Sequence, residues 1–212
     1  MTEYMFCRTQ EVEMAEGRRE RKKRETRAAI SEVATGLFFE RGFDAVTIDE
    51  VARAAGVSKM TVFNYFARKE DLMFDREAEG IEMLREALAN RGRKTVLDAL
   101  RDEVARLVAE ENVFTTFDSE VLRFWKVVEE SPAFRARFRE LAEEVRELLV
   151  GYFEGPNADL VAGLVVAGWR SAYRAGLAAA RKGKSRRKAA AEMERVLDVA
   201  LAAARAATRV GS

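Results

Sequence analysis

The stretch TIDEVARAAGVSKMTVFNYF, residues 47–66, predicts two short helices joined by a tight turn. Thr47 and Glu50 have the spacing of a capping box, in which the threonine hydroxyl accepts from a free backbone N–H and the glutamate bonds back to the cap. Gly56 would end the first helix in a left-handed conformation, and Ser58 would cap the second. Two helices joined in this way have the outline of a DNA-reading helix-turn-helix.

The second of these helices would point unusual side chains outward. At about 100° per residue, with Val62 facing the core, Met60 and Asn64 point away from it. A helix that only filled a core would not direct Met60 and Phe63 to solvent beside Lys59. The DNA major groove, in contrast, offers thymine methyl groups to apolar side chains and base edges to an amide. On this stretch alone, an ordinary helical hairpin is the alternative.

A basic segment precedes the two helices. From Arg18 to Arg27 there are seven basic and two acidic residues, in a chain whose net charge is only +1. A charge run is often just a solvated face, but its place before a helix-turn-helix favours an arm that contacts phosphates. Residues 1–17 carry four Glu and one Arg and have no apolar period, which predicts disorder.

Three motifs with fixed spacing resemble the N-terminal domain of the tetracycline-repressor (TetR) family, over residues 24–74. The motifs are Leu37-Phe38-x-x-x-Gly42-Phe43, Thr47-Ile48-x-x-Val51-Ala52-x-x-Ala55-Gly56-Val57-Ser58 and Tyr65-Phe66-x-x-Lys69-Glu70-x-Leu72. The resemblance implies an all-α homodimer, with an N-terminal three-helix helix-turn-helix domain and a C-terminal helical domain for ligand binding and dimerisation. In the family, the ligand loosens the grip on DNA.

Carried over by position, the family's DNA contacts fall on eight residues. Lys59, Met60, Phe63 and Asn64 would read bases, and Thr47, Thr61, Tyr65 and Lys69 would hold phosphates. The basic residues Arg24 and Arg27 and the cap Ser58 complete the predicted DNA-binding set. The family often has a small residue at the position of Met60, which suggests an individual base preference here. It commonly has Tyr at the position of Phe63, so one hydroxyl bond is lost.

The composition indicates a nearly all-helical protein without catalytic equipment. The 212 residues include two Pro and no His, and His is the commonest acid/base group and metal ligand. We find no paired-Cys spacing, phosphate-binding Gly loop or nucleophile motif, so no enzyme activity, catalytic residue, metal or cofactor is predicted. Cys7 is the one cysteine and fits a reducing cytosol. The apolar run 160–169 is too short to span a bilayer and no signal peptide is evident, which predicts a soluble cytoplasmic protein.

We expect three parts in the chain: a disordered tail at residues 1–17, the DNA-binding domain at 18–76, and the effector-binding and dimerisation domain at 77–212. A helix is expected from near Arg68 to about Asn90. Further helices should start at Thr95, at Asp118 or Ser119, and at Ser131-Pro132.

Small residues recur every four positions along residues 158–182. One strip is Gly163, Ala167, Ser171, Ala175 and Ala179, and a second is Gly168, Ala172, Gly176 and Ala180. Such strips let another helix approach closely. With residues 186–207, this helix could form a four-helix dimer interface, as the family does, although packing within one chain would produce the same pattern. The basic run 181–188 between them is expected to be a solvated loop, and a second nucleic-acid contact is the less favoured alternative.

Aromatic side chains are the candidates for an effector pocket. They lie in the helices that enclose the family's pocket, and an apolar or aromatic effector suits them better than a metal-chelated one. The candidates are Phe114, Phe117, Phe124, Trp125, Phe134, Phe138, Tyr152, Trp169 and Tyr173. Each could equally be plain core. The leading hypothesis is a ligand-responsive repressor that binds a palindromic operator as a homodimer. The alternative is a DNA-binding activator or partner-regulated module without a small-molecule effector.

Overall fold

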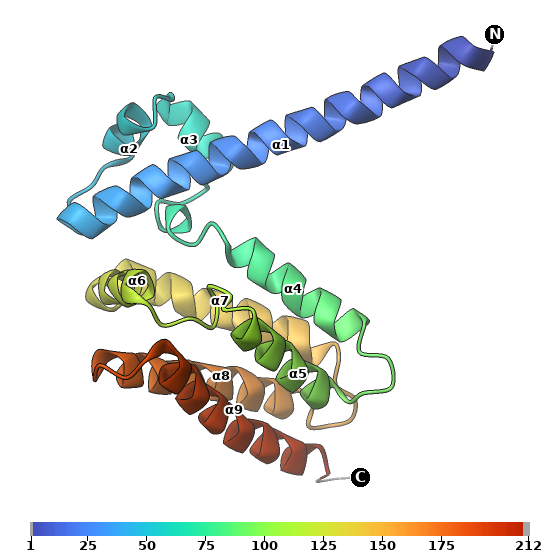
Figure 1. Ribbon diagram of the computed structural model, residues 1–212, viewed down its shortest axis with the longest axis vertical. Helices are drawn as coiled ribbons and strands as arrows, with labels where there is room; N and C mark the ends of the chain where they lie inside the picture. The colour runs from blue at the N-terminus through green and yellow to red at the C-terminus, as the bar shows by residue number, and fades with distance from the viewer. Residues whose placement is uncertain (1, 210–212) are drawn as a thin grey trace. The chain divides into compact units, whose positions relative to one another are not determined.

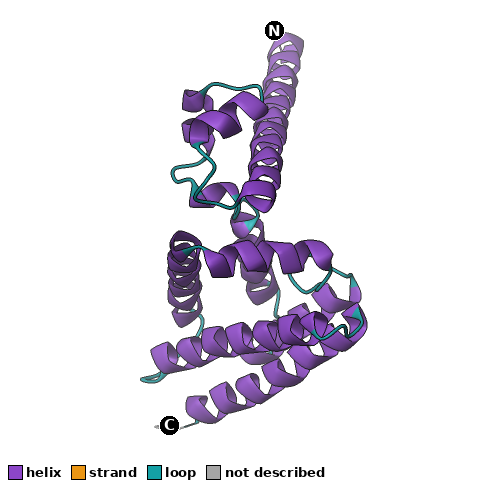
Figure 2. Cartoon of the chain, turned by 90° about the vertical axis from the view of Figure 1, so that its left-hand side faces the viewer, coloured by secondary structure: helices purple, strands orange, loops and turns teal. Residues whose placement is uncertain are grey.

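The computed structural model describes residues 2–209, and the side chains from Gly17 onward except that of Arg18. Every regular element in this range is a helix (Figures 1 and 2). The chain divides into two compact units, residues 1–75 and 76–212. Over the described range, no helix combines the length and the apolar character needed to cross a membrane.

In the first unit, residues 2–75 form three helices and a short 3₁₀ turn. They are α1 (Thr2–Arg41), α2 (Ile48–Ala54), α3 (Lys59–Tyr65) and η1 (Glu70–Leu72). Ile30, Ala34 and Phe38 recur every four residues on α1 and are buried. Val51 of α2 and Val62 of α3 are fully buried as well. The helices α2 and α3 lie beside the C-terminal part of α1 (Figure 1), and α2 contacts both α1 and α3.

The helix α1 begins at Thr2, although the sequence predicts disorder for residues 1–17. Residues 2–16 contain neither Pro nor Gly and include good helix formers such as Glu, Met and Arg. A helix that the packed part has already nucleated extends at little cost, because each added residue gains one hydrogen bond. No apolar stripe is needed for such an extension. The side chains of Cys7 and Arg18 lie outside the described ones.

The prediction of one continuous helix from Arg68 to Asn90 is wrong, because the helical turn η1 ends at Leu72. The next helix, α4 (Glu77–Ala89), begins five residues later. The Leu72 carbonyl accepts a hydrogen bond from the Ser31 hydroxyl at 2.8 Å, and Leu72 itself is fully buried in the first unit. This bond takes the place of the backbone bond that would have continued the helix.

The described residues of the second unit form six helices. They are α4, α5 (Val96–Ala109), α6 (Ser119–Glu130), α7 (Pro132–Val150), α8 (Ala158–Arg181) and α9 (Arg186–Thr208). The predicted caps are confirmed, since the side chains of Thr95, Asp118 and Ser131 each accept from a backbone N–H three residues on. The helices α8 and α9 lie side by side along their length (Figures 1 and 2). Met193 and Leu197 of α9 are buried in the core that these helices share.

The two strips of small residues on α8 have different surroundings. A Cβ on Gly168 would lie 2.3 Å from the Cβ of Ala200 on α9, and one on Gly176 would lie 2.2 Å from the ring of Phe117. The strip with these glycines therefore packs within the chain. In the other strip, Ala167 and Ser171 are exposed.

Candidate nucleic-acid interface

Local hydrogen bonds build the turn between α2 and α3 as the sequence predicts. The Thr47 hydroxyl accepts from the backbone N–H of Glu50 at 3.2 Å, and the Glu50 carboxylate accepts from the backbone N–H of Thr47 at 2.8 Å. Gly56 has φ +67°, the left-handed value that the turn requires. The Ser58 hydroxyl accepts from the backbone N–H of Thr61 at 3.0 Å. Both helix starts are thereby fixed by side chains close in sequence.

Glu50 also joins the start of α2 to the end of α1. Its carboxylate lies 2.8 Å from the guanidinium of Arg41. The backbone N–H of Thr47, and next the side chain of Arg41, lower the pKa of Glu50 to about 2. The ionised carboxylate is thus the form that the fold favours.

We expect Glu50→Gln to lower the thermal midpoint at pH 7 and to have less effect as the pH falls. The pKa of Glu50 is depressed in the folded state, so its contribution is complete above the ordinary value of 4.5 and is lost as the pH falls toward 2. Glutamine keeps an acceptor for the Thr47 N–H, and the change therefore isolates the charge. Thermal melts of both proteins from pH 7 to pH 2.5 provide the measurement. A difference in midpoint that stays constant over this range would contradict the assignment.

The outward face of α3, hereafter the reading face, comprises Lys59, Met60, Phe63 and Asn64. All four side chains are exposed, with Met60 at 68% and Phe63 at 44%. Val62 on the opposite side is fully buried, so the predicted orientation of the helix is confirmed. Exposed apolar side chains that lie together on one face are typical of interaction sites.

Lys59 of the reading face already has an ion-pair partner. Its ammonium lies 3.1 Å from the carboxylate of Asp49 on α2, and both side chains are more than half exposed. An exposed pair of this kind contributes little, about 0–1 kcal/mol, so a phosphate or a base edge can compete for Lys59. Without such a competitor, the pair keeps the ammonium beside Asp49.

Two residues that are predicted to contact phosphates, Lys69 and Arg27, also have partners inside the first unit. The ammonium of Lys69 donates to the Phe43 carbonyl at 2.5 Å and lies 4.0 Å from the centre of the Phe43 ring. Burial lowers the pKa of Lys69. The guanidinium of Arg27 donates to the Tyr65 carbonyl at the end of α3 and lies 4.2 Å from the ring centre of Phe66. Both cations stabilise the positions of neighbouring segments.

The other predicted DNA-binding residues lie on or near the surface. Arg24 is exposed on α1, and Thr47 and Ser58 are exposed at the two helix starts. Thr61 and Tyr65 are half-buried on α3. The hydroxyls of Ser58 and Thr61 lie 2.8 Å apart, so the hydroxyl of Thr61 already has one hydrogen-bonding neighbour.

Six of the nine aromatic candidates for the effector pocket form one cluster, hereafter the aromatic cluster. Trp125 of α6 is central to it, with its ring centre 5.0 Å from that of Phe138 and 5.3 Å from that of Tyr173. Burial raises the pKa of Tyr173 to about 12. The members are Phe117, Phe124, Trp125, Phe138, Trp169 and Tyr173.

The remaining three candidates have other surroundings. Phe114 packs against Gly80 of α4, where an added Cβ would lie 3.2 Å from the ring. Phe134 is fully buried near the start of α7. Tyr152 has the guanidinium of Arg91 at 5.9 Å from its ring centre.

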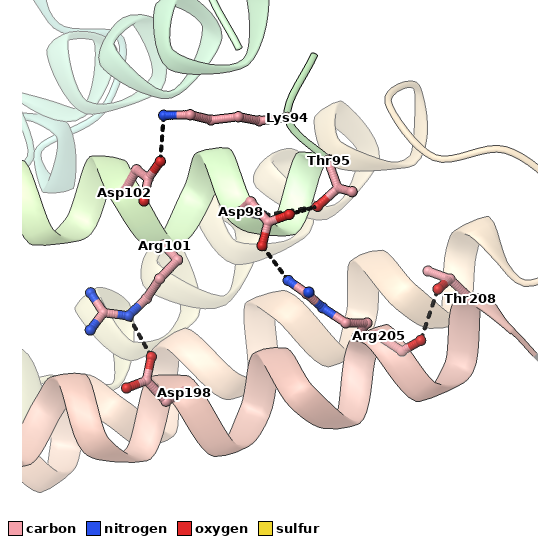
Figure 3. A network of polar contacts seen from close by, with 8 residues as sticks. All are labelled: Lys94, Thr95, Asp98, Arg101, Asp102, Asp198, Arg205 and Thr208. Atoms are coloured by element: carbon pink, nitrogen blue, oxygen red, sulfur yellow. Dashed lines mark hydrogen bonds and ion pairs between the residues drawn. The ribbon is translucent and has the colours of Figure 1, made fainter. Parts of the chain in front are cut away.

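A groove with a volume of about 380 Å³ lies between α5 and α9, and none of the aromatic candidates lines it. Figure 3 shows two ion pairs that join its walls, Asp98 with Arg205 and Arg101 with Asp198. Bonds from Thr95, and then from Arg205, lower the pKa of Asp98. The partners lie about a hundred residues apart in sequence, so no helical spacing could have revealed this groove.

The chain is similar to known transcriptional regulators. The family model described as "Bacterial regulatory proteins, tetR family" matches residues 30–75. MftR of Mycobacterium tuberculosis, a regulator named for mycofactocin biosynthesis, is 34% identical over 142 residues, which cover 65% of this chain and 68% of MftR. YdeS of Bacillus subtilis, a helix-turn-helix regulator, is 42% identical over 50 residues, 24% of this chain and 25% of YdeS.

Solved structures share the fold at low sequence identity. SmeT in complex with triclosan has a TM-score of 0.59 at 15% identity, covering 84% of this chain and 91% of SmeT. NalD of Pseudomonas aeruginosa, a repressor of a multidrug efflux pump, has a TM-score of 0.51 at 19% identity, covering 84% of this chain and 96% of NalD.

The capped helices, the tight turn and the exposed reading face define a helix-turn-helix DNA-binding protein with an all-helical second unit. Together with the family model and the match to MftR, they give a more exact identification. The chain belongs to the TetR family of bacterial transcriptional regulators.

Proposed function

We propose that this regulator is a ligand-responsive repressor that binds a palindromic operator as a homodimer. The reading face carries the proposal, because it combines a cation, an amide and two exposed apolar side chains on one short helix. Asn64 would bond adenine in a bidentate manner, and Met60 and Phe63 would contact thymine methyl groups. Arg24 and neighbouring basic residues of α1 would hold phosphates.

Exposed apolar and small side chains on α8 and α9 support a homodimer. Leu160 is 54% exposed and Val199 of α9 is 65% exposed, and Ala167 and Ser171 on α8 are small and exposed. A second copy packed on these side chains would cover them with a four-helix interface. Two α3 helices related by the two-fold axis would then read half-sites about one helical turn apart.

The proposal assigns a different function to each of the two units. Residues 18–76 would bind DNA, and residues 77–212 would bind the effector and form the dimer. An effector that favours a wrong spacing of the two α3 helices would weaken operator binding, by roughly 5–150-fold for a coupling of about 1–3 kcal/mol. Acting on the chromosome, the protein would work in the cytoplasm.

Selection of genomic DNA fragments by the purified protein tests the operator. We expect enrichment of a two-fold symmetric site with half-sites about ten base pairs apart, and a complex containing an even number of protomers. Enrichment of an asymmetric site bound by one protomer would contradict the homodimer. Screening metabolites for release of the selected fragment then tests the effector. If the regulator has no effector, none of the metabolites would release the DNA fragment.

A further inference from the structure

Arg170 on α8 is a cation without a counterion in the second unit. The side chain is half-buried, and its Nε atom is buried without a hydrogen-bond partner. Among the described residues, no carboxylate forms an ion pair with it. A buried donor without an acceptor costs free energy, and a charged group more than a neutral one. An anion that bound at this position would therefore satisfy the guanidinium of Arg170.

The surroundings of Arg170 are aromatic. Its guanidinium carbon lies 5.9 Å from the ring centre of Phe138, which packs edge-on against Trp125 at 5.0 Å. Tyr173 follows Arg170 by one turn of α8 and contacts Trp125 as well. A guanidinium pairs best with a carboxylate, through two parallel hydrogen bonds. Aromatic faces offer stacking and edge-on contacts to another ring.

The groove between α5 and α9 makes an instructive contrast. Two of the cations that line it, Arg101 and Arg205, are each paired with a carboxylate, as Figure 3 shows for Asp198 and Asp98. An anion that bound to either of these two cations would have to compete with its carboxylate. At Arg170 it would supply a missing acceptor.

We infer that Arg170, Phe138, Trp125 and Tyr173 form a binding site for a small aromatic carboxylic acid, and that such an acid is the effector. This inference rests on the proposed ligand-responsive function and names its ligand class. The carboxylate pairs with the guanidinium, and the ring of the acid replaces contacts that the aromatic side chains make with one another. A neutral aromatic would leave the buried Nε donor unsatisfied.

The two tryptophans of the chain provide a direct reporter, because Trp125 and Trp169 both belong to the aromatic cluster. The probes are 3-phenylpropionate and its neutral amide, 3-phenylpropionamide, titrated against the full-length protein by tryptophan fluorescence and calorimetry. We expect the acid to change the fluorescence and to bind at least about tenfold more tightly than the amide.

Arg170→Met should remove this preference, so that the acid and the amide bind within about twofold of each other. Arg139→Met is the matched control, because Arg139 is exposed one residue after Phe138 on α7. It should retain the preference. Loss of folding does not confound the test, since removal of an unpaired buried charge should leave the thermal midpoint of the ligand-free protein unchanged or raise it.

Equal binding of acid and amide by the wild type would overturn the inference, as would a preference that survives Arg170→Met. So would a lack of acid binding at millimolar concentrations. A neutral compound that releases operator DNA from both wild type and Arg170→Met would overturn the inference and leave the proposed function standing. Acid binding that depends on Arg170 but leaves the operator bound would uphold the site and contradict its regulatory role.

Discussion

Gly168→Ala should destabilise the second unit by about 2 kcal/mol. The new Cβ would lie 2.3 Å from the Cβ of Ala200, an atom fixed by the backbone of α9. Relief requires α8 and α9 to separate, and overpacking of this kind costs about 1–3 kcal/mol. We expect the upper part of that range, since no rotamer change can remove the clash. The better helix propensity of alanine returns about 1 kcal/mol. Urea unfolding followed by circular dichroism measures the difference.

Two further variants isolate the cause. Gly36 on α1 is also helical but has no atom within 4 Å of an added Cβ, so Gly36→Ala should be neutral or slightly stabilising. The double variant Gly168→Ala/Ala200→Gly moves the methyl group from α9 to α8. It should recover the loss almost completely, because the helical glycine is only moved from α8 to α9 and the two propensity effects, each about 1 kcal/mol, cancel. No recovery in the double variant would show that the close approach of α8 and α9 is not the cause.

Ala167→Glu, at the neighbouring position, should leave each protomer folded and break the dimer. Ala167 is exposed, so the glutamate is solvated in a single protomer. In the proposed interface it would be a buried charge without a partner. The cost, about 3 kcal/mol or more, would weaken dimerisation at least about 100-fold. Operator affinity should fall by about the same factor, because one protomer can no longer hold the other at its half-site. Sedimentation and operator titration measure the two effects.

The matched control is Ala78→Glu on α4, which also adds a carboxylate at an exposed alanine on a helix of the second unit. It should remain dimeric. An Ala167→Glu protein that sediments as a dimer would place the interface elsewhere on the molecule. Unfolding of the variant would instead contradict the exposed position of Ala167.

Predictions from the sequence succeeded where the determining contacts are local. The caps at Thr47, Ser58 and Thr95 each involve residues three positions apart, so spacing alone was sufficient. The orientation of α3 followed from its period. The start of α1 and the break after Leu72 could not be found in this way. The early start of α1 reflects helix propagation without an apolar stripe. The end of the helical turn at Leu72 depends on a hydrogen bond from Ser31, 41 residues away.

The same limit applies to the site residues. The intramolecular partners of Lys69 and Arg27 could not be predicted from spacing, because their ammonium and guanidinium groups bond carbonyls 26 and 38 residues away in the sequence. Both strips of α8 consist of small residues, so the sequence could not tell which one meets α9. That the Nε atom of Arg170 has no hydrogen-bond partner likewise depends on how the helices pack around it, and spacing along the sequence does not show this.

Comparison of Asn64→Ala with Arg24→Ala on a selected operator and on a scrambled duplex tests the central claim most directly. For Asn64→Ala, a residue of the reading face, we expect a loss of about 1–3 kcal/mol on the operator and almost none on the scrambled duplex. For Arg24→Ala, an exposed cation of α1, we expect similar losses on both duplexes and a salt dependence reduced by about one charge. Equal losses on the two duplexes for Asn64→Ala would contradict base recognition by α3.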